Sequence, residues 1–218
     1  MQKAVLFDFD GVIADSLPTQ YDWLKKICGI FGKPFSYKAP VDLRAIHFEK
    51  VVPDLYLYLG FDWEKEGDSV WAEYYKHKAS MQPELVKGIE GVIEELWCST
   101  VPLGIASNAL GSEIKTHLKR LNMNKYFDTV VGREDKKQKP DPEILLAAAE
   151  EIKIKPENCF YIGDAPSDVQ AARNAGMTPI AAYFGDSAYK SLDSLLSEQP
   201  DFIITNPADL LGIVFERM

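Results

Sequence analysis

Short apolar runs alternate with stretches of helical spacing along much of the chain. The apolar runs predict strands at 3–9, 101–107, 127–132, 158–164, 178–184 and 201–205. Between some of them, apolar side chains recur at helical intervals and predict helices at 112–122, 142–152 and 167–176. Strands that are apolar on both faces and alternate with helices are typical of a parallel sheet covered by helices on both sides. The pattern therefore predicts an α/β fold with a doubly wound parallel sheet.

One long interval interrupts this alternation. Residues from about 16 to 84 contain no convincing buried strand and have the pattern of successive helices, among them 18–32 and 68–79. A crossover between parallel strands needs only a dozen or more residues, so an interval of this length indicates an inserted domain. We therefore expect a core domain formed by residues 1–15 and 86–218 and a helical domain formed by residues 16–85.

The charge and composition of the chain limit the kinds of binding partner that we expect for it. The chain has 218 residues and a formal net charge of −9, which argues against nucleic acid or an anionic membrane as the main partner. No apolar run approaches the roughly 20 residues that cross a bilayer, and the start of the chain lacks the features of a signal peptide. Its three cysteines are widely spaced and indicate no disulfide framework. We expect a cytoplasmic protein that is a monomer or weak homodimer.

Polar side chains with reactive groups follow the predicted strands. Asp8 and Asp10 end the first strand, and others follow later strands or precede a predicted helix. In an open α/β sheet, ligands bind beyond the carboxyl ends of the strands, so these groups should converge on one edge. The candidate site residues are Asp8, Asp10, Ser107, Asn108, Lys139, Asp164 and Asp168.

Four motifs that contain these residues resemble, in their order, those of the haloacid dehalogenase superfamily of phosphohydrolases. They are DFDGV at 8–12, IASN at 105–108, KPDP at 139–142 and GDAPSD at 163–168. The helical interval after the first motif is similar to the helical cap of the subgroup that includes phosphoglycolate phosphatases, pyrophosphatases and β-phosphoglucomutases. The resemblance implies a Rossmann-like core and a helical cap domain that closes over the site.

The resemblance also implies roles for the candidate residues. Asp8 would attack phosphorus and form an aspartyl-phosphate, and Asp10 would act first as general acid and then as general base. Ser107 and the backbone amide of Asn108 would hold the phosphoryl oxygens. Lys139 would neutralise the charge of the phosphoryl group and of the Asp8 carboxylate.

A divalent cation would relieve the crowding of these carboxylates and a phosphate. Each like-charge pair at about 4 Å costs about 4 kcal/mol at an effective dielectric constant near 20. Mg²⁺ suits such a site because it prefers oxygen ligands and keeps waters for the phosphate. By resemblance, its ligands would be the Asp8 carboxylate, the Asp10 main-chain carbonyl and Asp164. Asp168 would act from outside the direct ligands or serve the first turn of its helix.

The leading interpretation is a Mg²⁺-dependent phosphatase that hydrolyses a small phosphorylated metabolite of the phosphoglycolate or sugar phosphate class. A phosphomutase of the β-phosphoglucomutase type would use the same aspartates, and the motifs do not separate the two. A non-catalytic binding protein on the same fold is the third hypothesis. In the helical domain, Arg44, His47 and Lys50 are candidates for contact with an anionic substrate tail.

Overall fold

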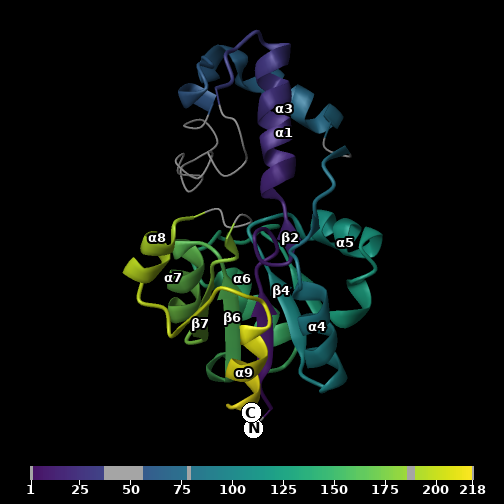
Figure 1. The fold of residues 1–218 in the computed structure, drawn as a ribbon, viewed down its shortest axis with the longest axis vertical. Helices are drawn as coiled ribbons and strands as arrows, with labels where there is room; N and C mark the ends of the chain where they lie inside the picture. The colour runs from purple at the N-terminus through teal and green to yellow at the C-terminus, as the bar shows by residue number, and fades with distance from the viewer. Residues whose placement is uncertain (1, 37–55, 78–79, 186–189, 218) are drawn as a thin grey trace. The chain divides into compact units, whose positions relative to one another are not determined.

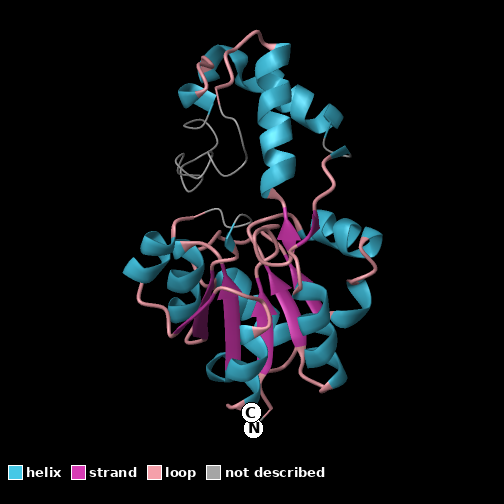
Figure 2. Ribbon diagram, viewed as in Figure 1, coloured by secondary structure: helices cyan, strands magenta, loops and turns pink. Residues whose placement is uncertain are grey.

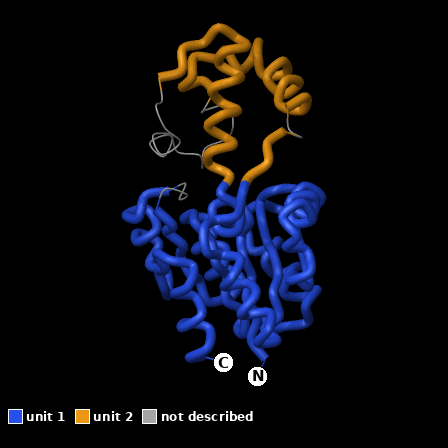
Figure 3. The backbone as a smooth tube through the Cα atoms, turned by 45° about the vertical axis from the view of Figure 1, so that its right-hand side comes forward, with its two compact units in different colours: residues 1–15, 84–218 blue, residues 16–83 orange. Residues whose placement is uncertain are grey.

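The computed structural model describes residues 2–36, 56–77, 80–185 and 190–217, so Arg44, His47 and Lys50 lie outside the described residues. The chain divides into two compact units (Figure 3). Residues 1–15 and 84–218 form an α/β unit, and residues 16–83 form a helical unit.

The α/β unit is built on a six-stranded sheet in which every pair of neighbouring strands is parallel (Figures 1 and 2). The strands lie in the order β5-β4-β1-β6-β7-β8. Their bounds are β1 Ala4–Phe7, β4 Leu103–Ala106, β5 Thr129–Val131, β6 Cys159–Gly163, β7 Thr178–Ala182 and β8 Phe202–Ile204. Each overlaps one of the predicted strands, and the predicted doubly wound α/β fold is confirmed.

Helices pack on both faces of this sheet. Buried side chains of α4, α5 and α9 share one apolar cluster with one face, and those of α6 and α7 share a second cluster with the other face. A smaller cluster joins α7 and α8 to β7. The bounds are α4 Ile89–Cys98, α5 Gly111–Arg120, α6 Glu143–Glu151, α7 Pro166–Asn174, α8 Leu192–Ser197 and α9 Asp209–Phe215. Single 3₁₀ turns lie at η3 Asn124–Tyr126 and η4 Pro156–Asn158.

Several of these elements were not predicted. Helices α8 and α9 have six and seven residues, too few for an apolar repeat over two full turns to be recognised. The short strands β2 Ala14–Asp15 and β3 Glu84–Leu85 form a two-stranded antiparallel sheet. Strands of two residues carry no periodicity, so only the tertiary pairing defines them.

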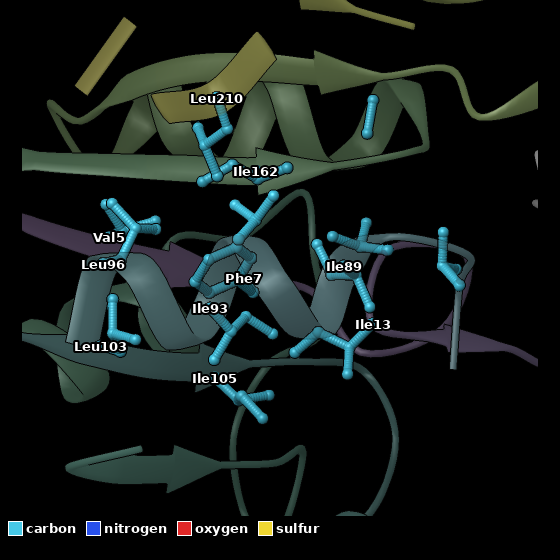
Figure 4. Packing of buried hydrophobic residues seen from close by; sticks show 14 of the residues in the cluster. Val5, Phe7, Ile13, Ile89, Ile93, Leu96, Leu103, Ile105, Ile162 and Leu210 are labelled. Atoms are coloured by element: carbon cyan, nitrogen blue, oxygen red, sulfur yellow. The ribbon is translucent and has the colours of Figure 1, made fainter. Parts of the chain in front are cut away.

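The largest apolar cluster lies between the sheet and helices α4, α5 and α9. Figure 4 shows the ring of Phe7 from β1 among the side chains of Ile93, Ile105 and Ile162. All four residues are buried. Because β1 occupies the middle of the sheet, this packing holds the strand that carries Asp8.

Replacing Ile93 with alanine should lower the free energy of unfolding by about 2–5 kcal/mol, because the shortened side chain leaves a cavity in a close-packed core. Ile93 has no exposed surface, whereas Leu146 on α6 is 39% exposed and provides a matched control. Leu146→Ala should change the free energy of unfolding by less than about 0.5 kcal/mol. Urea unfolding of both variants checks the prediction, and equal losses would contradict it.

The helical unit has an aromatic core of its own. It contains α1 Leu17–Ile30 and α3 Trp63–His77, and its buried residues include Trp23, Tyr56 and Phe61. The indole N–H of Trp23 donates a hydrogen bond of 2.9 Å to the hydroxyl of Tyr56. Burial raises the pKa of Tyr56 to about 12, so this hydroxyl is neutral and accepts the bond.

Candidate active site

Asp8 follows the last residue of β1 and is buried. Its backbone N–H donates to the carbonyl of Ile162 on β6 at 2.8 Å, which continues the ladder between the two strands by one residue. Its Oδ1 accepts a hydrogen bond of 2.8 Å from the backbone N–H of Phe9. The carboxylate is thus fixed at the carboxyl end of the central strand.

The turn after Asp8 depends on Gly11. Its φ of +75° lies in the left-handed region that glycine adopts without strain. A Cβ atom at this position would lie 2.1 Å from Oδ2 of Asp164. Glycine therefore permits both the turn and the close approach of the loop after β6. In the same turn, Asp10 is half-buried and forms an isolated backbone bridge with Ala14.

Lys139 is buried, with 7% of its surface exposed, and its ammonium group lies between two carboxylates. Nζ is 3.0 Å from Oδ1 of Asp8 and 2.5 Å from Oδ1 of Asp168. It also donates a hydrogen bond of 2.9 Å to the hydroxyl of Tyr161. Burial alone would lower the pKa of Lys139, but the charges of Asp168 and Asp8 outweigh burial and raise it. The ammonium group is therefore charged at neutral pH.

Two asparagines hold the loop that presents Lys139. The backbone N–H of Lys139 donates to Oδ1 of Asn108 at 2.9 Å. The side-chain amide of Asn174, at the end of α7, donates to the carbonyl of Pro140 at 3.1 Å. The peptide bond between Lys139 and Pro140 is cis. The side chain of Asn108 thus links the end of β4 to this loop, a contact that its predicted role at the phosphate did not include.

Asp168 lies near Asp8 and contacts three other residues, Ala165, Lys139 and Tyr161. Its Oδ2 accepts a hydrogen bond of 3.0 Å from the backbone N–H of Ala165 at the start of α7. Its Oδ1 contacts Lys139. A Cβ atom at Gly163 would lie 2.2 Å from Cβ of Asp168, so glycine at the end of β6 makes room for this side chain. The bond to Ala165 places the Asp168 carboxylate at the first turn of its helix, and its role beside a metal stays a prediction.

Three buried carboxylates form a group that suits a divalent cation. Oxygen atoms of Asp8, Asp164 and Asp168 all lie within 4.8 Å of one another. Both contacts of the Asp8 carboxylate fall on Oδ1, so Oδ2 has no protein partner among the described residues. A cluster of carboxylate oxygens is the donor set that Mg²⁺ prefers, and the ammonium group of Lys139 contacts two of its three members, Asp8 and Asp168. The residues present therefore fit a bound Mg²⁺.

Ser107 lies directly after β4, at the same edge of the sheet. It is buried, and its Oγ accepts a hydrogen bond of 3.3 Å from the backbone N–H of Ala109. Its backbone N–H donates to the carbonyl of Val131 at 3.1 Å. The structure thus brings Asp8, Lys139 and Asp168 into direct contact, whereas Ser107 is held by its own loop and by β5.

Tyr161 belongs to this network and was not predicted. It lies within β6 and has 1% of its surface exposed. The signal available in the sequence is a single hydroxyl-bearing side chain inside the apolar stretch CFYIG. Burial, followed by the charges of Asp168 and Asp8, raises the pKa of Tyr161 well above its ordinary value. Its hydroxyl is therefore neutral and can both donate and accept hydrogen bonds.

Within the described part of the chain, no helix is both long enough and apolar enough to span a membrane.

Comparison with known proteins agrees with the fold and indicates the family. The sequence model of the haloacid dehalogenase-like hydrolase family matches residues 5–182. A phosphorylated carbohydrates phosphatase of Thermotoga maritima is 27% identical over 218 residues, which cover 98% of this chain and 99% of that protein. A phosphoglycolate phosphatase of Photorhabdus laumondii is 26% identical over 97% of this chain and 92% of its own length.

A solved structure has a similar fold. A haloacid dehalogenase-like family hydrolase from Streptococcus pneumoniae superposes with a TM-score of 0.81 and is 25% identical. The superposition covers 97% of this chain and 98% of that chain.

Proposed function

This chain belongs to the haloacid dehalogenase-like hydrolase family and is a phosphatase, and we propose that it hydrolyses a small phosphate monoester in a Mg²⁺-dependent reaction. The proposed route passes through an aspartyl-phosphate on Asp8. The observation that carries it is the buried contact between Lys139 and Asp8, beside two further carboxylates. Lys139 contacts one oxygen of the Asp8 carboxylate, and the other oxygen, which has no protein partner among the described residues, is suited to nucleophilic attack.

In the first step, Oδ2 of Asp8 attacks phosphorus and the bond between phosphorus and the ester oxygen breaks. The leaving oxygen takes a proton from Asp10, which lies two residues further along the same turn. The products of this step are a free alcohol and a phosphoryl group on Asp8. Lys139 offsets the negative charge that accumulates beside Asp8.

In the second step, Asp10 takes a proton from a water molecule as that water attacks phosphorus. The bond between phosphorus and Asp8 breaks, and inorganic phosphate leaves. Asp10 then carries its proton again, and Asp8 is again an ionised carboxylate.

The remaining candidate residues would bind and orient the phosphoryl group. Ser107 and the backbone amide of Asn108 would donate hydrogen bonds to its oxygens. The Asp8 and Asp164 carboxylates, with the Asp10 carbonyl, would hold Mg²⁺, which supplies positive charge between the carboxylates and the phosphoryl oxygens. Asp168 would fix Lys139 and the start of α7.

The activities of these two relatives support the substrate class. One is a phosphatase of phosphorylated carbohydrates and the other a phosphatase of phosphoglycolate. Both substrates are small phosphate monoesters, and we propose this class for the present chain.

Phosphate release from a panel of small phosphate monoesters tests the proposal. The panel should include phosphoglycolate and several sugar phosphates, each assayed with Mg²⁺ and with EDTA. We expect turnover with Mg²⁺ and a loss of at least about 100-fold in EDTA, because the carboxylate cluster then repels the substrate phosphate. Equal turnover in EDTA would contradict the metal dependence. An isomerised sugar phosphate without free phosphate would assign a phosphomutase instead.

A further inference from the structure

The hydroxyl of Tyr161 is buried within an otherwise apolar face of the sheet. Tyr161 pairs with Leu6 of β1 in the strand register and packs with Ala4 and Cys159 in the cluster beneath α6 and α7. A hydroxyl in such a place destabilises the fold unless it forms hydrogen bonds. The fold therefore tolerates a tyrosine at this position only if its hydroxyl has hydrogen-bond partners.

Those partners belong to two different parts of the site. The hydroxyl accepts a hydrogen bond of 2.9 Å from Nζ of Lys139, and it donates one of 2.7 Å to the carbonyl of Ala106. It also lies 3.3 Å from Oδ1 of Asp168, the carboxylate oxygen that Lys139 contacts. Ala106 is the last residue of β4 and directly precedes Ser107. Because β1 lies between β4 and β6, the tyrosine side chain reaches across one strand to make this bond.

The hydroxyl also completes the surroundings of the ammonium group. Lys139 has three N–H donors and three acceptors, which are Oδ1 of Asp8, Oδ1 of Asp168 and the hydroxyl of Tyr161. The third acceptor belongs to a strand of the central sheet, so it restricts the position of the ammonium group beside the two carboxylates.

We propose that Tyr161 is a positioning residue for phosphoryl transfer. Its hydroxyl keeps the ammonium group of Lys139 in contact with Asp8. Through its bond to the Ala106 carbonyl, the hydroxyl also links this ammonium group to the end of β4, which Ser107 follows. The proposal rests on the proposed function of the site. Tyr161 acts through Lys139 and the Ala106 carbonyl and does not itself contact the reacting atoms.

Tyr161→Phe should lower kcat by about 10- to 100-fold, the effect expected from one hydrogen bond to a charged group. KM should change by less than about threefold, since the charge of Lys139 stays in the site and only its alignment is lost. Inhibition by orthovanadate, which imitates the transferring phosphoryl group, should weaken by the same factor as kcat/KM. Inhibition by inorganic phosphate should change much less.

Tyr126→Phe provides a matched control. Tyr126 is also a buried tyrosine of the α/β unit, and its hydroxyl lies 3.5 Å from Oε1 of Glu94, away from the site. This variant should keep kcat within about twofold of the wild type. Thermal unfolding of both variants should show folded proteins at the assay temperature, which separates a loss of alignment from a loss of folded enzyme.

A double-mutant cycle with Lys139→Gln tests the route of the effect. If Tyr161 acts through Lys139, adding Tyr161→Phe to Lys139→Gln should cost less than about threefold in kcat. The same factor in both backgrounds would overturn the proposal, as would a Tyr161→Phe variant with kcat within twofold of the wild type. A wild-type protein without phosphatase activity would contradict the proposed function itself, whereas these outcomes contradict only the role of Tyr161.

Discussion

Asp8→Asn should reduce phosphate release by at least about 1,000-fold, the largest effect expected of any single substitution in this chain. Asparagine has nearly the shape of aspartate, and its side-chain oxygen can still accept the hydrogen bond from the backbone of Phe9. It lacks the negative charge that makes Oδ2 a nucleophile. The measurement is the initial rate of phosphate release with Mg²⁺, on the best substrate of the panel.

Asp128→Asn is the matched control for this experiment. Oδ2 of Asp128 accepts a hydrogen bond of 3.0 Å from the backbone N–H of Leu103, at the start of β4 and far along the strand from Ser107. The same chemical change there should leave the rate within about twofold of the wild type. Turnover by Asp8→Asn at a rate close to that of the wild type would show that another group attacks phosphorus.

Lys139→Ala should reduce both the rate and the stability. The rate should fall by about 100-fold or more, because the charge beside Asp8 is no longer offset. The free energy of unfolding should fall by about 3–5 kcal/mol, since removal of one partner leaves buried carboxylates without a counter-charge. Rates of phosphate release and urea unfolding curves measure the two effects.

The destabilisation of Lys139→Ala should be smaller in acid. Burial raises the pKa of Asp168 and the charge of Asp8 adds to this, while Lys139 opposes both. Without Lys139, the pKa of Asp168 in the folded protein rises further above its unfolded value. The folded state then binds protons more readily than the unfolded state, so stability recovers as the pH falls through that raised pKa. Unfolding curves at pH 5.5 and pH 8 should show this difference.

Lys137→Ala provides the comparison for Lys139→Ala. Lys137 lies in the same loop, but its side chain is 75% exposed and its ion pair with Asp141 measures 3.6 Å. An exposed pair of this kind contributes little, so the free energy of unfolding should change by less than about 0.5 kcal/mol. Similar losses in both lysine variants would contradict the special role of the buried ammonium group.

The sequence alone was sufficient to predict the α/β sheet and the edge at which the candidate residues gather. Apolar runs of strand length alternate with helical patterns, and this alternation is a property of neighbouring residues. Asp8, Ser107 and Asp164 lie at or near the ends of three of these runs and directly follow strands β1, β4 and β6. In a parallel sheet such positions share one edge, whatever the order of the strands. The roles assigned to them stay predictions until the variants are measured.

The short elements could not be predicted in the same way. Helices α8 and α9 and strands β2 and β3 are too brief to show a repeat, and tertiary packing and pairing stabilise them. The strand order β5-β4-β1-β6-β7-β8 could not be predicted from the sequence either, because several strand orders are compatible with the same alternation of strands and helices.

The sequence by itself determined the fold class, the sheet edge of the candidate site and the types of group that meet there. Only the tertiary structure decided their contacts: Asn108 binds the backbone of Lys139, Asp168 holds both Lys139 and the start of α7, and Tyr161 reaches Lys139 and β4. Residue type and spacing define which groups are available. Their hydrogen-bond partners depend on distances across β1 between strands far apart in the sequence, and these distances exist only in the folded chain.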